Sequence, residues 1–500
     1  MLTSLSLPPF NYFIINFLTF TLFFLFLFKK SRQYKSKKFF FLYGWLFGFG
    51  YFVTNLYWIS ISLTFDQNYK FLIPLTVILI PGFLSLFYGL ISFFFLIFKP
   101  KNITGSFLVF SLIFGILEFI RGSILTGFPW NLIIYSFSQQ LEFLSVTSIL
   151  GTYGLNLFCI SLFSSPAVLI LRDSKKDIFV CFLFIIIAML FLIYGHFYKE
   201  KFYKIENTIY QYKVRVIGSN IGLERFYSNT DSISVIEDLI NISNPNFNEK
   251  IVFIWPEGMI PDLSQEIRNE YKQIFEKNFN ENHFLVIGNN SKFTNDGHKN
   301  YYNSLSIYDN KFNLLDSYNK IKLVPFGEFL PFEKILKKIG LKSLTNYYQP
   351  FSKGDLREII KIESQNFSLK ILPLICYEII YSGNLFNNSN FDFKVNISED
   401  GWFGQSIGPK QHFVHSIFRA IESGKYVLRS ANNGIAAVVN PLGIIEEQVH
   451  FGESGYIDLK RIRKIQPTIF SQYGNKIFGL LILLYISFIF SFNKISNEQY

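Results

Sequence analysis

Long stretches without a charged side chain constrain this chain more than any other feature. Residues 71–98 contain no Asp, Glu, Lys or Arg over 28 positions. At about 1.5 Å of rise per residue, a helix of this length exceeds the roughly 30 Å of hydrocarbon in a bilayer. Similar uncharged runs occupy 10–28, 39–65, 103–117, 143–171, 178–195 and 477–493. The sequence therefore predicts seven membrane spans.

Two further observations support a membrane protein. Half of the residues are hydrophobic, the mean hydropathy is +0.27, and 62 residues are Phe. The first run lacks the basic start and small-residue cleavage site of a secretory signal peptide. We expect a helical bundle of about six spans over 1–197, an α/β domain over 205–467 and a C-terminal transmembrane helix over 468–493.

The basic residues of the first 200 positions predict the orientation of the chain. Loop 29–38 carries six basic residues and no acid, and two later loops carry Lys99 with Lys101 and Arg172 with Lys175 and Lys176. A single threading places all three loops on the cytoplasmic face. It predicts a multi-pass protein of a bacterial cytoplasmic membrane, with 197–467 facing the periplasm. The net charge of the chain is +11, but a membrane explains the basic loops of the first 200 residues better than nucleic acid does. We expect no nucleic acid partner.

Charged residues return after position 205 and separate short apolar runs. Period and composition predict strands at 214–217, 251–254, 284–287, 369–375, 393–397, 426–428 and 435–439, and helices at 231–241, 262–277 and 411–424. Strands and helices that are mixed over about 260 residues predict one layered α/β domain.

Candidate catalytic groups follow three of these apolar segments. Cys376 ends a strand and precedes Glu378, Glu257 follows the strand 251–254, and Lys320 and Glu328 bracket an apolar turn. A lone buried Cys is usually structural, and a lone carboxylate after a strand is usually solvated. Together these groups supply a base, a cation and a thiol, as acyl transfer through a thioester requires.

The remaining cysteines, Cys159 and Cys181, lie in apolar runs. Their positions indicate neither a disulfide framework nor a zinc site, and we expect no metal or cofactor.

The order Glu, Lys, Cys after successive strands resembles the nitrilase superfamily. The words WPE, YNK, LVPFGEFLP, CYE and GWFG, together with GFPWN, GTYG and RSANNG, resemble the apolipoprotein N-acyltransferase family over nearly the whole chain. The resemblance implies a nitrilase-like αββα sandwich on a multi-span helical bundle. It also implies transfer of an acyl chain from a phospholipid, typically phosphatidylethanolamine, through a Cys thioester to the α-amino group of a diacylated apolipoprotein.

The resemblance assigns a role to each matching residue. It implies that the base is Glu257, the lysine Lys320 and the nucleophile Cys376, with supporting residues Glu328, Tyr377, Glu378 and Asn303. In physical terms, Lys320 would favour the thiolate and the oxyanion, and Glu257 would move the proton. Glu328 would orient the buried ammonium group of Lys320.

The chain departs from the family pattern at several positions. The family usually has eight spans, and Glu399-Asp400 stands where the family has Asn-Asp. Gly218 or Ser219, and Phe226 or Tyr227, stand where the family often has Gln and Trp.

Two other functions remain open from the residues alone. A membrane-tethered carbon–nitrogen hydrolase would use the same three groups, and apolar walls facing the bilayer would distinguish the acyltransferase. Loops 323–332 and 340–351, the latter with Leu341, Leu344, Tyr347, Tyr348 and Phe351, would either lie on the membrane or pack locally. A transporter is disfavoured because Glu118 and Arg121 are the few ionisable residues near the spans.

The words GFPWN and GTYG would either anchor the interface or shape a lipid entry.

Overall fold

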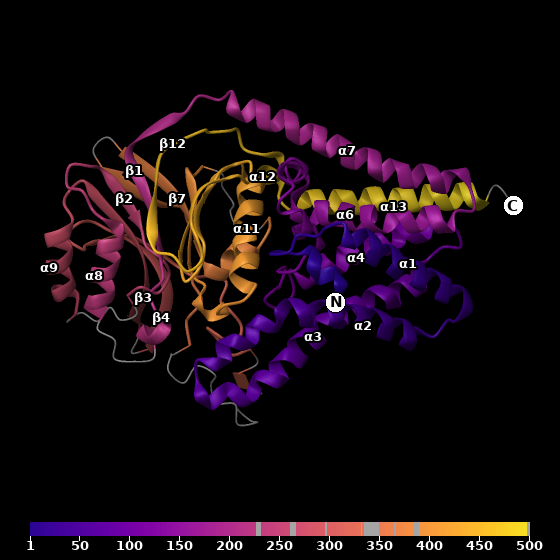
Figure 1. The fold of residues 1–500 in the computed structure, drawn as a ribbon, viewed down its shortest axis with the longest axis horizontal. Helices are drawn as coiled ribbons and strands as arrows, with labels where there is room; N and C mark the ends of the chain where they lie inside the picture. The colour runs from indigo at the N-terminus through magenta and orange to yellow at the C-terminus, as the bar shows by residue number, and fades with distance from the viewer. Residues whose placement is uncertain are drawn as a thin grey trace.

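A computed structural model describes residues 1–226, 232–260, 267–295, 298–331, 333–334, 350–364, 367–383 and 390–497. A helical bundle and an α/β sandwich lie side by side, and the C-terminal helix returns from the sandwich to the bundle (Figure 1). The predicted loop residues 332, 340–349 and the position Tyr227 lie outside the described residues.

In the described part of the chain, seven long helices form the bundle. They are α1 (Ile15–Gln33), α2 (Lys37–Leu56), α3 (Ile73–Phe98), α4 (Ile103–Arg121), α6 (Thr147–Leu171), α7 (Lys175–Tyr203) and α13 (Lys476–Asn497). Within the described residues, five helical stretches are long and apolar enough to cross a membrane: Lys37–Thr64, Gln67–Phe98, Ile103–Arg121, Thr147–Leu171 and Lys175–Tyr203. The helix α1 and the shorter apolar stretch Lys476–Phe492 of α13 occupy the other two predicted runs. The total of seven spans stays a prediction.

Two predicted runs are not single α-helices. The run 39–65 continues beyond α2 as the 3₁₀ segment η2 (Tyr57–Thr64), and a second 3₁₀ segment, η3 (Gln67–Leu72), then leads into α3. The run 143–171 contains a short helix, α5 (Leu141–Leu144), and α6 is interrupted at Gly151, where φ is +68°. A β-carbon at Gly151 would lie 2.0 Å from the ring of Phe470, so both the backbone and the close packing require glycine here.

The interruption of α6 joins the bundle to the α/β domain. The backbone N–H of Thr152, freed by the break, donates to the Glu422 carboxylate at 2.9 Å, and the Thr152 hydroxyl donates to the same oxygen at 2.6 Å. Glu422 belongs to α11 (Gly408–Ser423) of the α/β domain and also forms an ion pair with Arg419. The word GTYG therefore marks a buried joint between the two parts, a role that neither interpretation of the sequence included.

Within the residues that the structure describes, twelve strands form the core of the α/β domain. They are β1 (Thr208–Ser219), β2 (Ile251–Ile254), β3 (His283–Asn295), β4 (His298–Tyr308), β5 (Leu314–Asn319), β6 (Ile360–Ser364), β7 (Phe367–Ile375), β8 (Phe393–Glu399), β9 (Tyr426–Asn432), β10 (Ala436–Val439), β11 (Ile445–Val449) and β12 (Gly455–Ile462). The order along the sheet is β5-β4-β3-β2-β1-β9-β8-β7-β6, with β12 on β1 and β10 between β9 and β11. Strands β1 and β9 pair at only two positions, which divides the strands into two halves.

The two halves pack face to face. Val216 and Val252 of one half share an apolar cluster with Val395 and Leu428 of the other. The helices α8 (Ser232–Ser243) and α9 (Ile267–Asn278) cover the outer face of the first half, and α11 covers the second half on the side of the bundle (Figure 1). These four layers confirm the predicted αββα sandwich.

The predicted strands all occur, and five further strands were missed. The missed strands are β4, β5, β6, β11 and β12. Several of them alternate polar with apolar residues, as in the sequence GYIDLKRI of β12, and they lack the continuous apolar run of a strand that is buried on both faces.

Candidate active site

Cys376 lies at a sharp change in the backbone. It directly follows β7 and begins the 3₁₀ segment η6 (Cys376–Ile380), with φ of +48°. A non-glycine residue in this left-handed region is strained, and such strain persists only where the surrounding structure holds it. Cys376 is 8% exposed. The nucleophile predicted from sequence therefore sits on a rigid turn at the end of a buried strand.

Glu257 reaches the same site from the loop after β2. One carboxylate oxygen accepts a hydrogen bond from the backbone N–H of Glu399 at 2.8 Å, and the other accepts from Asn303 Nδ2 at 2.7 Å. Gly288 of β3 makes room for this loop, since a β-carbon there would lie 2.5 Å from the α-carbon of Glu257. The carboxylate of the candidate base is thus held in one orientation by groups from two strands, β8 and β4.

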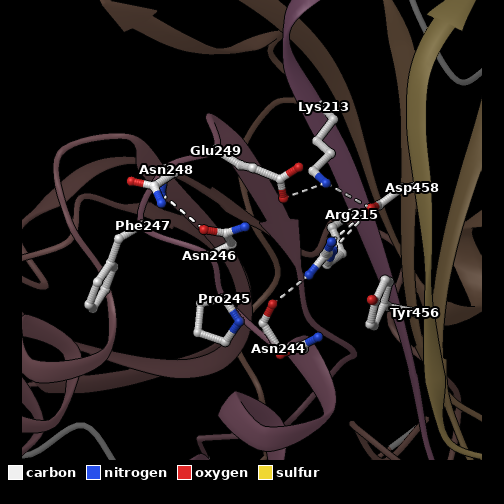
Figure 2. Close-up of a pocket in the computed structure, with 10 residues that line it drawn as sticks. All are labelled: Lys213, Arg215, Asn244, Pro245, Asn246, Phe247, Asn248, Glu249, Tyr456 and Asp458. Carbon is white, nitrogen blue, oxygen red and sulfur yellow. Dashed lines mark hydrogen bonds and ion pairs between the residues drawn. The ribbon is translucent and has the colours of Figure 1, made fainter.

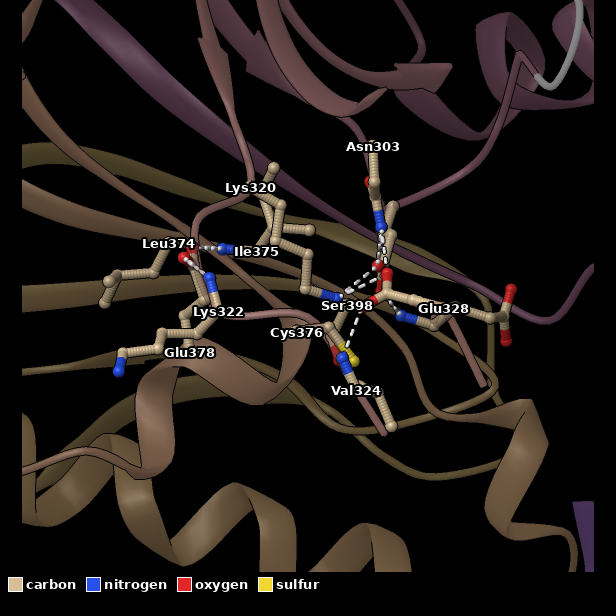
Figure 3. A network of polar contacts seen from close by, with 12 residues as sticks. Asn303, Lys320, Lys322, Val324, Glu328, Leu374, Ile375, Cys376, Glu378 and Ser398 are labelled. Atoms are coloured by element: carbon tan, nitrogen blue, oxygen red, sulfur yellow. Dashed lines mark hydrogen bonds and ion pairs between the residues drawn. The ribbon is translucent and has the colours of Figure 1, made fainter. Parts of the chain in front are cut away.

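Lys320 lies between two carboxylates, of which Figure 3 labels that of Glu328. It follows β5, is 1% exposed, and its Nζ lies 2.8 Å from Glu328 Oε1 and 3.4 Å from Glu257 Oε1. Burial alone would lower the pKa of Lys320, but Glu328 and Glu257 outweigh burial and raise it above its ordinary value. Lys320 therefore stays an ammonium group throughout the physiological pH range.

Asn303 and Glu328 complete the arrangement around the ammonium group. Asn303 Nδ2 donates to Glu328 Oε1 at 2.9 Å as well as to Glu257, and the backbone N–H of Val324 donates to Glu328 Oε2 at 2.8 Å. Figure 3 shows Asn303, Lys320 and Glu328 converging beside Cys376. These contacts support the expectation that Glu328 orients Lys320.

The thiol of Cys376 is neutral at rest. Burial raises its pKa well above the ordinary value, and the negative charge of Glu257 raises it further. Lys320 and the hydroxyl group of Ser398 act in the opposite direction but do not offset burial. The expected effect of Lys320 on the thiolate thus has the right sign and is outweighed. Removal of the thiol proton has to accompany attack on a substrate, which is the role expected of Glu257.

Glu378 holds the backbone around the site by hydrogen bonds. Its buried carboxylate accepts hydrogen bonds from the backbone of Ile375 at 2.9 Å, Ile321 at 3.0 Å and Lys322 at 3.1 Å. It also accepts from Tyr318 at 2.7 Å and pairs with Arg357 at 2.6 Å. Glu378 therefore fixes the turn that holds the thiol to the segment that follows Lys320. Tyr377, the other supporting residue, points to the bundle instead.

A second cluster of buried polar groups behind Cys376 was missed. Asp400 pairs with Arg429 at 2.8 Å and with His412 at 3.0 Å. Arg429 donates to Asn396, whose Nδ2 lies 3.4 Å from the carbonyl oxygen of Cys376. The sequence signal was the run of polar residues at the end of the otherwise buried strand β8.

A separate hollow of about 610 Å³ lies beside the start of β2 and the middle of β1, away from the strand ends that lead to the candidate site (Figure 2). Its charged groups neutralise one another, since Lys213 pairs with Glu249 at 2.6 Å and Arg215 pairs with Asp458 at 2.6 Å. None of the residues that were predicted to be catalytic lines it.

Comparisons with known proteins match both parts of the chain. Residues 1–165 match the apolipoprotein N-acyltransferase N-terminal domain, and residues 228–466 match the carbon-nitrogen hydrolase domain. A curated apolipoprotein N-acyltransferase from Rhodopseudomonas palustris is 30% identical over 97% of this chain and 92% of the relative. The chain belongs to the apolipoprotein N-acyltransferase family.

Other relatives of the family agree. A Bradyrhizobium diazoefficiens relative of the same name is 30% identical over 97% of this chain and 91% of its own. A Brucella melitensis relative is 29% identical over 83% and 78%. Among solved structures, an amidase from Nesterenkonia sp. AN1 is 14% identical and covers 54% of this chain and 94% of its own, with a TM-score of 0.36. That last likeness is too distant to carry an argument.

The family membership confirms the main functional prediction. The protein is an enzyme of the acyltransferase family with a nitrilase-like domain, and it is a membrane protein that acts on lipoproteins. The tethered hydrolase and the transporter are correspondingly disfavoured, because the match extends over the bundle as well as the α/β domain.

Proposed function

We propose that Cys376, Glu257 and Lys320 transfer an acyl chain in two steps from a phospholipid to an apolipoprotein. One observation carries the proposal: the ammonium group of Lys320 is buried beside both the thiol of Cys376 and the carboxylate of Glu257. A thiol, a base and a fixed cation around one point are what the two steps require.

In the first step, the thiol sulfur attacks the ester carbonyl carbon of the phospholipid, and Glu257 accepts the thiol proton. Lys320 stabilises the negative charge that develops on the carbonyl oxygen. The carbon–oxygen bond of the ester breaks, and Glu257 returns the proton to the departing lysophospholipid alcohol. The product is a thioester on Cys376, and the number of protons and electrons is unchanged.

In the second step, the α-amino group of the diacylglyceryl-Cys of an apolipoprotein attacks the thioester. Glu257 takes the proton of the amine, the carbon–sulfur bond breaks, and the proton returns to the sulfur of Cys376. Asn303 and Glu328 hold Lys320 and Glu257 in place through both steps. Tyr377 and Glu378 hold the turn on which the thiol sits.

We also propose that the donor is phosphatidylethanolamine and that the site faces the periplasm from the cytoplasmic membrane. The orientation is supported by the three basic loops, which one threading places on the cytoplasmic face. The periplasm is where a lipidated N-terminal Cys with a free amine would meet the α/β domain.

The decisive experiment is a mass spectrum of the intact protein after incubation with defined phosphatidylethanolamine and no acceptor. The expected result is a mass gain of one acyl chain, which neutral hydroxylamine removes and which Cys376→Ala lacks. A diacylated lipopeptide with a free α-amine should then discharge the adduct and gain one chain. A protein that never gains the chain but hydrolyses small amides would be a tethered hydrolase, and the proposal would be wrong.

A further inference from the structure

One ion pair next to the active site involves a residue that breaks the family pattern. Glu399 is the last residue of β8 and is 1% exposed, and its carboxylate pairs with Arg225 of the 3₁₀ segment η5 (Leu223–Phe226). Arg225 is 5% exposed. Both charges are therefore removed from water, and each depends on the other for compensation.

The carboxylate of Glu399 is fully engaged. Besides Arg225, it accepts hydrogen bonds from Asn432 Nδ2 at 2.7 Å, Asn433 Nδ2 at 3.3 Å and the backbone N–H of Gly401 at 2.8 Å. These contacts come from the ends of β8 and β9 and join the two strands at the edge that carries the site. The position of the Glu399 backbone is thereby fixed by its own side chain.

The pair contacts the candidate base from two sides. The backbone N–H of Glu399 donates to Glu257 Oε2 at 2.8 Å. The Nε of Arg225 donates to the carbonyl oxygen of Gly258, the next residue, at 3.3 Å. Arg225 also donates to the carbonyl oxygens of Gly222 at 2.8 Å and Ile221 at 3.4 Å. One residue of the pair thus holds the carboxylate of Glu257, and the other holds the backbone of the residue that follows it.

We propose that Arg225 and Glu399 act as one positioning unit for Glu257, and that the orientation of the base toward Cys376 depends on their pairing. The inference rests on the proposed function for the role of Glu257 as the base and for the identity of the acyl donor. If Arg225 is neutralised, Glu399 becomes an uncompensated buried carboxylate and has to move or take up a proton. Either change disturbs the N–H group that holds Glu257.

The same domain offers a matched control. Arg215 is 3% exposed, pairs with Asp458 through two hydrogen bonds, and donates to the carbonyl oxygens of Ser243 and Asn244 at 2.7 Å each. It resembles Arg225 in burial and in the kind of partners but lies at the hollow of Figure 2, in the middle of β1 and not at the strand end that leads to the candidate site. Substitution of Arg215 therefore reports the general cost of breaking a buried ion pair in this domain.

The experiment compares Arg225→Gln, Glu399→Gln, the double variant and Arg215→Gln in detergent. The first readout is the single-turnover rate of Cys376 acylation by phosphatidylethanolamine, per folded molecule. The second is the pH midpoint of Cys376 alkylation by iodoacetamide, which needs no lipid and senses the charge of Glu257 beside the thiol. The variant Glu257→Gln gives the reference midpoint for a site without that charge.

Arg225→Gln should slow acylation by about tenfold or more, on the scale of coupling between contacting residues, and move the alkylation midpoint toward that of Glu257→Gln. Glu399→Gln should have a smaller effect, because the amide keeps most hydrogen bonds. The double variant should be less impaired than Arg225→Gln, since no charge is left uncompensated. Arg215→Gln should lower the unfolding temperature and leave both readouts unchanged.

The proposal is wrong if Arg225→Gln matches the wild type in both readouts. It is also wrong if the fold-decrease in acylation rate of the double variant equals the product of the fold-decreases of the two single variants. If the alkylation midpoint of the wild type differs from that of Glu257→Gln but phospholipid never acylates the wild type, the proposed donor would be wrong. The midpoint shifts would still test the positioning unit, so the two failures are distinguishable.

Discussion

The hydroxyl group of Tyr377 donates a 2.8 Å hydrogen bond to the carbonyl oxygen of Gly127, 250 residues earlier in the chain. Tyr381 makes the equivalent contact with Thr126, also at 2.8 Å. The residue after the candidate nucleophile is thus attached to the loop that follows α4 in the bundle. The position of the thiol therefore depends on the bundle as well as on the α/β domain.

The loop itself is fixed from within the bundle. Arg121, at the end of α4, is fully enclosed, pairs with Glu118 and donates to the carbonyl oxygen of Phe128. Trp130 of the same loop stacks on His412 with a centroid distance of 5.1 Å and donates to Gln411 at 3.0 Å. The word GFPWN thus contacts the catalytic domain directly, which extends the two roles considered from sequence.

Removal of the Tyr377 hydroxyl group should loosen the turn without changing the thiol chemistry. Tyr377→Phe should slow Cys376 acylation by about two- to tenfold, the scale of one lost neutral hydrogen bond, and should leave the pH midpoint of alkylation unchanged. Single-turnover mass spectrometry measures the rate. Tyr473→Phe, at a tyrosine that is 58% exposed, is the control. Equal rates for the two variants would contradict the link.

Much of the fold could be predicted because its signals are local. Uncharged runs indicate helices by length alone, and the buried strands that carry Glu257 and Cys376 are continuous apolar runs with a polar end. The family words then assigned Lys320, Glu328 and Asn303, each of which the structure brings to one point.

The remaining features depend on contacts between distant residues. Glu422 caps the break in α6 from 270 residues away, and neither position is unusual by itself. Glu399 could be recognised as a departure from the family, but its partner Arg225 lies 174 residues earlier. No pattern in a single sequence joins such pairs, because the pairing is set by packing of strands and helices.

Glu257 should affect the reactivity of the thiol and the transfer of acyl chains in opposite directions. Glu257→Gln should slow acyl transfer at least about 100-fold, the usual scale for a general base. The same change removes a negative charge that raises the pKa of Cys376. Alkylation of the thiol by iodoacetamide near neutral pH, at about pH 7.5, should therefore become faster.

Lys320→Met is the complementary variant. It should also slow transfer at least about 100-fold through loss of oxyanion stabilisation. Because Lys320 lowers the pKa of Cys376, its removal should slow alkylation. Thermal unfolding checks that both variants fold. A Glu257→Gln variant that is slower in both assays would show that Glu257 is not the charge beside the thiol.

Asp400 should stabilise the protein except in strong acid. Burial alone would raise its pKa, but Arg429 and His412 outweigh burial and lower it from 3.8 to about 2. A carboxyl group whose pKa is lower in the folded state contributes stability above its unfolded pKa and loses that contribution as the pH falls through the folded value. The contribution is therefore complete above about pH 4.

Asp400→Asn should lower the free energy of unfolding at neutral pH by on the order of 3 kcal/mol, because it leaves the charge of Arg429 buried without a partner. The difference from the wild type should shrink as the pH falls below about 4. Unfolding temperatures measured across pH in detergent test both statements, with Asp238→Asn at an exposed position of α8 as the control. A constant difference across the pH range would contradict the assigned cause.

The orientation of the α/β domain can be tested with single cysteines. In a Cys376→Ala background, the two remaining cysteines, Cys159 and Cys181, are buried in the bundle. Ser454→Cys places a thiol at an exposed position just before β12, and Gln33→Cys places one at the exposed end of α1, beside the predicted cytoplasmic loop. Neither side chain is part of the site.

A membrane-impermeant maleimide added to intact spheroplasts should label Ser454→Cys at once and Gln33→Cys only after lysis. The reason is the excess of Lys and Arg in loop 29–38, which favours retention of that loop on the cytoplasmic side. Since α1 and the loop precede every other helix of the bundle except η1 (Leu2–Ser6), their orientation sets the direction in which each later helix enters the bilayer. Labelling of Gln33→Cys before lysis and of Ser454→Cys only after it would reverse the threading and place the candidate site in the cytoplasm.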